Sequence, residues 1–155
     1  MRIIPRLLQF SLIMIVAAAA CKKSSSSSAD NTPMTLITSS PWKIDTAGLD
    51  LDHNGTIDYG DTTLGACYKD NTYQFNKDST GIANNGAIKC DDSEEATFSF
   101  TWSFVDSDQK KIMSTADPLL AEGVNILTLT SAKLVVYKDT TISGIDLWYI
   151  LSLKH

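Results

Sequence analysis

The chain has 155 residues, of which 43% are hydrophobic, and it carries 13 basic and 18 acidic side chains, so it is long enough for one ordinary globular domain. A nucleic-acid binder needs a basic face to displace counterions, and this chain has more acidic than basic side chains. We therefore expect no nucleic-acid partner. The sequence contains only two histidines, His53 and His155, so few residues are available for histidine-dependent hydrolysis. We therefore also expect that the protein is not an enzyme.

Residues 1–20 have the three parts of an export signal. Arg2 and Arg6 give a basic start, residues 7–16 are mostly apolar, and residues 17–20 are alanines. Removing this segment takes away both arginines, so the 13 basic side chains fall to 11 lysines against the 18 acids. Since arginine is the usual bidentate partner of phosphate and carboxylate groups, its loss argues further against nucleic acid.

The alanines before Cys21 resemble a bacterial lipobox, in which the cysteine receives the lipid and becomes the new N-terminus. The pattern predicts a palmitate-type lipid on Cys21, and ordinary cleavage at an A-x-A site is the alternative. Residues 21–33 contain no large apolar side chain, which indicates a Ser-rich flexible tether. No later segment reaches the roughly 20 apolar residues that spanning requires, so we expect a lipid-anchored protein. Lys22 favours the outer membrane, facing either the periplasm or the cell surface.

Lipidation of Cys21 would leave Cys67 and Cys90 as a possible disulfide pair. Such a bridge closes a loop of about two dozen residues and would contribute roughly 3 kcal/mol of stability. Two buried free thiols are the alternative.

Past the tether, the sequence alternates with a period of two, as β-strands do. The clearest case is residues 97–104, where four aromatic side chains share one face and four hydroxyls the other. The aromatic stripe predicts either core or the wall of a ligand site. Residues 145–153 alternate similarly, with apolar side chains on both faces. Shorter candidate strands are residues 42–46, 72–76, 80–83, 111–114, 125–130 and 134–139.

These strands are joined by mostly short links rich in turn formers, which favours pairing between sequence neighbours. The predicted fold is therefore all-β, an antiparallel up-and-down meander of about eight strands that closes into a barrel over residues 34–155. Only two stretches are compatible with helix, residues 34–39 as a plug at one end and residues 118–122 as a brief surface helix.

The lipobox and tether, Trp42 at the start of the first strand, residues 67–76 and the Thr101-Trp102-Ser103 run resemble the bacterial lipocalin-like lipoproteins. The resemblance implies a calycin-like barrel, with Trp42 closing one end, and a habit of binding small apolar molecules. The chain departs from the family pattern in having Ser40 where a lipocalin has Gly, and no arginine to pack on Trp42. An eight-stranded barrel either fills with side chains or holds one small ligand, and the ligand-binding residues stay unknown at this point.

Residues 50–61 match the twelve positions of an EF-hand calcium loop, which supplies the hard oxygen ligands that calcium prefers. Gly55 permits the sharp turn and Ile57 turns inward. The predicted metal ligands are Asp50, Asp52, Asn54, Thr56 through its carbonyl, Asp58 and Asp61. His53 occupies a non-ligand position that points to solvent. The alternative is an Asx-rich turn without metal.

Asp61 replaces the usual bidentate Glu of an EF-hand, which resembles the dockerin variant of the loop. Strand-like residues before the loop and Cys67 after it leave no room for two flanking helices, so we expect a calcium loop between strands. Its role would be structural, and chelation should lower the melting temperature. Residues 91–95 form a second acidic cluster, interpreted as a solvated loop or a weak cation site.

These features together predict a lipid-anchored, calcium-stabilised binding protein of the cell envelope that holds a small apolar ligand. The alternative is a structural or interaction lipoprotein with a solid barrel core, whose loops contact another envelope protein.

Overall fold

The computed structural model describes residues 31–61 and 64–155. The expected export signal, the lipid site at Cys21 and most of the tether lie outside these residues. Pro33, the last residue of the expected tether, is already part of a short helix, α1 (Pro33–Ile37), whose N-cap is Thr32. Within the described part of the chain, no helix combines the length and apolarity needed to cross a membrane.

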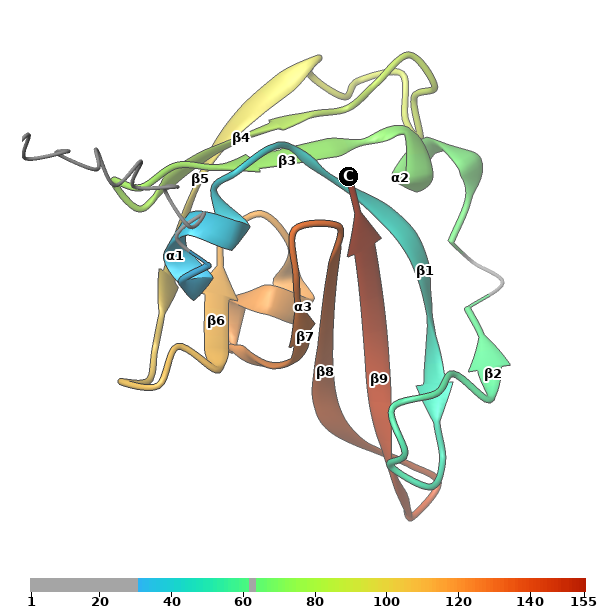
Figure 1. Cartoon of the computed structure of the whole chain (residues 1–155). Coiled ribbons are helices and arrows are strands. Elements are labelled where there is room, and N and C mark those ends of the chain that lie inside the picture. Colours follow the sequence, from blue (N-terminus) through green and yellow to red (C-terminus); the bar gives the residue numbers. More distant parts are fainter. Residues whose placement is uncertain (1–30, 62–63) are drawn as a thin grey trace, which may run out of the picture.

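Within the described residues, nine antiparallel strands follow one another around a single sheet that closes on itself (Figure 1). Each of the strands from β3 to β9 pairs with its sequence neighbour, and β1 pairs with β9 to complete the ring. The strands are β1 (Trp42–Asp50), β2 (Tyr59–Gly60), β3 (Thr72–Phe75), β4 (Thr80–Asn84), β5 (Thr97–Phe104), β6 (Lys111–Ser114), β7 (Val124–Leu129), β8 (Lys133–Ile142) and β9 (Ile145–Lys154). The all-β meander predicted from the sequence is confirmed.

The core follows from the alternation of side chains along the strands. In β5, Phe100 and Trp102 are buried while Thr101 between them is exposed. Phe75 on β3 packs edge-to-face against both aromatic rings, with centroid distances of 5.3 Å. Gly81 on β4 faces Phe100 so closely that a Cβ there would overlap the ring. The barrel interior beside β3, β4 and β5 is therefore filled with aromatic side chains.

Helix α1 and Trp42 close one end of the barrel. Trp42 is fully buried, and its Nε1 donates a 2.9 Å hydrogen bond to the carbonyl of Ile37, the last residue of α1. The ring of His155 lies 3.7 Å from that of Trp42, centroid to centroid, and its Nδ1 lies 3.0 Å from the carbonyl oxygen of Pro41. His155 therefore packs on Trp42 at this end of the barrel.

The opposite end carries the three longest connections. Because the strands alternate in direction, the links β1–β3, β4–β5, β6–β7 and β8–β9 all emerge at this end, which we call the open end. It includes α2 (Ala66–Asp70) and α3 (Pro118–Ala121), and α1 and α2 lie on opposite sides of the molecule in Figure 1. A disulfide between Cys67 and Cys90 joins two of these links, with 5.3 Å between the Cα atoms, as predicted.

Several elements differ from the sequence-based expectation. Strand β1 runs to Asp50 instead of residue 46, because β9 pairs with it along almost its whole length. Strand β2 lies inside the expected calcium loop, and residues 66–70 form a helical turn that the strand patterning did not indicate. The two predicted helical stretches are present as α1 and α3, each slightly shorter than expected.

Candidate functional site

A cavity of about 900 Å³ opens at the open end of the barrel. Its walls are inward-facing side chains of the strands and its mouth is formed by the links between them. The apolar part of the lining consists of Ile44, Ala47, Leu49, Leu64, Phe98, Ala116, Ile142 and Leu151. The barrel is therefore filled toward the closed end and hollow toward the open end.

Carboxylates from three different links line the same cavity. Asp61 follows β2, Glu94 lies between β4 and β5, and Asp117 precedes α3. Lys138 on β8 is the one cationic side chain among the described lining residues, and it forms an ion pair with Glu122. The lining therefore combines apolar walls with a negatively charged mouth.

Two tyrosines connect these walls with the carboxylates. Tyr149 on β9 donates a 2.6 Å hydrogen bond from its hydroxyl to Oδ2 of Asp61. Burial, this hydrogen bond and the negative charges of Asp61 and Asp117 together raise the pKa of Tyr149. Burial also raises the pKa of Tyr73, and the charges of Asp117 and Glu94 add to that effect. Both phenols are thus kept neutral beside negatively charged neighbours.

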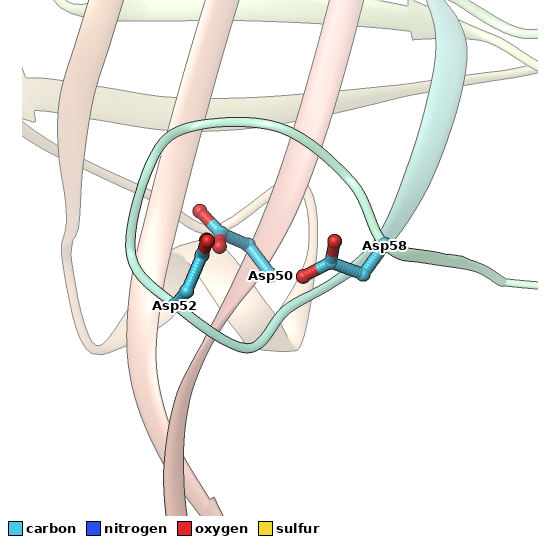
Figure 2. A group of neighbouring side chains, drawn as sticks. All are labelled: Asp50, Asp52 and Asp58. Carbon is cyan, nitrogen blue, oxygen red and sulfur yellow. The ribbon is translucent and has the colours of Figure 1, made fainter.

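The second constellation is the loop after β1. Asp50, Asp52 and Asp58 bring one ligand oxygen each within 4.8 Å of one another, and Figure 2 shows the three side chains inside the ring of the loop. Asp50 is fully buried although it lies on the outer face of the barrel, whereas Asp52 and Asp58 are exposed. This is a compact set of hard oxygens of the kind that binds calcium.

Backbone amides hold the loop in this shape. Gly55, with φ +85°, donates 2.7 Å from its N–H to Oδ2 of Asp50, and the N–H of Leu51 donates 2.9 Å to Oδ2 of Asp58. Burial opposes ionisation of Asp50, but hydrogen bonds from the backbone amides of Gly55 and Asn54 outweigh it and lower the pKa of that carboxyl. The Asp50 carboxyl is therefore ionised at neutral pH.

The loop lies against the outer face of the barrel. Gly48 on β1 has no room for a Cβ because the Ile57 side chain and the carbonyl oxygen of Tyr59 lie over it. Ile57 thus turns inward, as expected. The ring of His53 meets that of Trp148 edge-to-face at 5.0 Å, so its exposed side chain rests on an aromatic neighbour rather than pointing freely into solvent.

The six predicted metal ligands occupy different places. Asp50, Asp52 and Asp58 come together, and Asn54 lies beside them, with its side-chain nitrogen donating 3.0 Å to Oδ2 of Asp52. The N–H of Thr56 donates 2.7 Å to Oδ1 of Asn54, which keeps Thr56 within the turn. Asp61 lies apart from this set, in the cavity with Tyr149. The structure therefore separates the last position of the twelve-residue pattern from the first nine.

The second acidic cluster forms a turn at the mouth of the cavity. Oδ1 of Asp91 accepts hydrogen bonds from the N–H and hydroxyl of Ser93, and Glu94 accepts one from the N–H of Cys90. Among these residues, Glu94 lines the cavity.

Apart from Phe98, which belongs to the aromatic stripe interpreted as core or as the wall of a ligand site, the sequence-based interpretation did not identify the cavity residues. The alternation of residues 97–104 placed Phe98 on the aromatic face of its strand, and that of residues 145–153 placed Tyr149 on an apolar face, which was the available signal. The carboxylates of the mouth lie in links without periodic pattern, so nothing in the sequence showed that they meet.

A search of curated proteins found no match to this chain. A family model for the lipocalin-like domain matches residues 41–136, which is more than half of the chain and runs from the start of β1 into β8. With the closed meander, the plugged end and the cavity at the open end, the chain belongs to the lipocalin-like domain family.

Proposed function

We propose that this protein is a lipid-anchored binding protein of the bacterial cell envelope, whose barrel holds a small molecule in the cavity at its open end. The cavity carries the proposal: its volume of about 900 Å³ lies within the range of about 300–1,000 Å³ typical of small-molecule sites. A barrel that acts only through its loops would have a solid core and would not need such a cavity. We therefore prefer a ligand-binding function over the alternative, a structural or interaction lipoprotein.

The anchoring part of the proposal rests on the sequence. Alanines followed by Cys21 and a Ser-rich tether fit a lipid on Cys21, and Lys22 favours the outer membrane. The test is fractionation of cells expressing the full chain or its Cys21→Ser variant. We expect the natural chain in the membrane fraction and the variant in the soluble fraction. Equal membrane association of both would contradict lipidation.

The metal part of the proposal assigns calcium to the loop after β1. Asp50, Asp52 and Asp58 supply carboxylate oxygens, and the neighbouring Asn54 and Thr56 would add further oxygens from the same turn. Calcium there would hold the loop against the barrel by neutralising three carboxylates that otherwise repel one another. The role is structural.

Ligand binding is tested with N-phenyl-1-naphthylamine, a neutral probe whose fluorescence increases in an apolar cavity. We expect saturable binding by the barrel domain and its loss in Ala116→Phe, which fills the cavity. The matched control is Ala132→Phe, at an exposed turn between β7 and β8. No saturable binding by the natural domain, or equal binding by both variants, would show that the cavity is not a ligand site.

A further inference from the structure

The charge distribution of the cavity restricts the chemistry of its ligand. Three carboxylates, Asp61, Glu94 and Asp117, face one ammonium group among the described lining residues, and that ammonium is paired with Glu122. An anionic ligand such as a fatty acid would meet like charge in a partly desolvated site. A cation would meet opposite charge.

The aromatic lining favours a cation for an independent reason. Tyr68, Tyr73, Phe98 and Tyr149 line the same cavity, and the faces of aromatic rings attract cations. The hydroxyl of Tyr149 uses its proton on Asp61, so its oxygen faces the site as an acceptor. The negative charge, the aromatic rings and the Tyr149 hydroxyl oxygen thus all favour a group that carries positive charge and N–H donors.

The spacing of the carboxylates separates an organic cation from a metal ion. Among the described residues, the only carboxylate set compact enough to hold a metal is the one in the loop after β1, and the cavity carboxylates do not form such a set. They stand on three different links around the mouth, with apolar strand residues behind them. This arrangement suits a molecule with a charged head and an apolar body.

We propose that the cavity binds an amphipathic organic amine, with its ammonium group near Asp61, Asp117 and Tyr149 and its apolar body against Leu49, Phe98 and Leu151. This inference rests on the proposed function of the cavity as a ligand site, and it replaces the purely apolar ligand expected from the family resemblance by a cationic one.

The test is displacement of N-phenyl-1-naphthylamine by three ten-carbon competitors below their micelle concentrations: decylamine, decanol and decanoate. They share an apolar body and differ in charge. We expect decylamine to displace the probe at a concentration on the order of tenfold lower than decanol, and decanoate to be the weakest. Added salt should reduce the advantage of decylamine over decanol.

Isosteric variants locate the effect. Asp61→Asn and Asp117→Asn should each weaken displacement by decylamine about fivefold and leave decanol unchanged. Asp108→Asn removes the same charge from an exposed turn at the closed end and should change neither. Thermal melts show whether each variant is folded. The comparison of the three competitors on the natural protein does not depend on the variants.

The outcomes distinguish this inference from the proposed function. If the probe binds but decylamine is no better than decanol, or decanoate is the best competitor, the cavity is a ligand site and the amine assignment is wrong. If the probe does not bind at all, both proposals fail. An amine preference that persists in Asp61→Asn and Asp117→Asn would overturn the assignment of those two carboxylates.

Discussion

The two ends of the barrel differ in how they are built. The closed end is made of large buried side chains, where Trp42 is hydrogen-bonded to Ile37 of α1 and packs against His155. The open end is made of links that carry acidic residues and is held by the disulfide between Cys67 and Cys90. Hydrophobic packing stabilises the first end, whereas covalent and electrostatic constraints shape the second, where packing would fill the cavity.

The largest expected effect on stability is therefore at the closed end. Trp42→Ala removes a fully buried indole, its hydrogen bond to Ile37 and its contact with His155, and should cost about 3–5 kcal/mol in the free energy of unfolding, measured with denaturant. Trp148→Ala, on the outer face of β9, is the matched control and should cost less. A loss at Trp42 no larger than at Trp148 would contradict this account of the closed end.

At the open end, the disulfide should be the main constraint. Cys67 and Cys90 are separated by 23 positions in the sequence, and replacing both by Ser opens the loop that the disulfide closes. This double substitution should lower the free energy of unfolding by roughly 3 kcal/mol. Because the bridge joins two links of the mouth, probe binding should weaken in the double variant under conditions where it remains folded. Unchanged probe affinity would mean that the mouth keeps its shape without the bridge.

Calcium should stabilise the open end by a smaller amount. At a calcium concentration a hundredfold above the dissociation constant, linkage gives about 2.7 kcal/mol, measured as a rise in melting temperature that chelator reverses. Asp52→Asn should abolish the rise, whereas Asp92→Asn, which removes a charge from the other acidic cluster, should keep it. If chelator does not change the melting temperature of the natural domain, the loop is an Asx-rich turn without metal.

The smallest expected effect concerns pH. Oδ2 of Asp70, at the end of α2, accepts hydrogen bonds from the N–H groups of Ala87 (2.6 Å) and Ile88 (3.0 Å), which lower the pKa of Asp70 below its ordinary 3.8. A folded-state pKa below the unfolded value contributes stability above pH 3.8, and this contribution is lost as the pH falls through the folded value. The difference in melting temperature between the natural chain and Asp70→Asn should therefore shrink as the pH is lowered from 6 to 3. A difference independent of pH would contradict the role of the ionised carboxyl.

Part of the fold could be predicted because strand periodicity is local. The alternation of residues 97–104 and 145–153 indicated β5 and β9, and the short links indicated a meander. The full length of β1 was not visible, since residues 47–50 become strand by pairing with β9 about a hundred positions later. The twelve-residue calcium pattern likewise indicated Asp50, Asp52 and Asp58 correctly as neighbours, because they lie within one turn of chain.

Sequence alone determined the all-β class, the pairing of Cys67 with Cys90 as a possibility, and the acidic loop, because each depends on residue type and short spacing. Only the tertiary structure decided that Asp61 leaves that loop to meet Tyr149, that His155 covers Trp42, and that three distant carboxylates share one cavity. These contacts depend on closing the sheet between β1 and β9, which brings together residues that no local pattern relates.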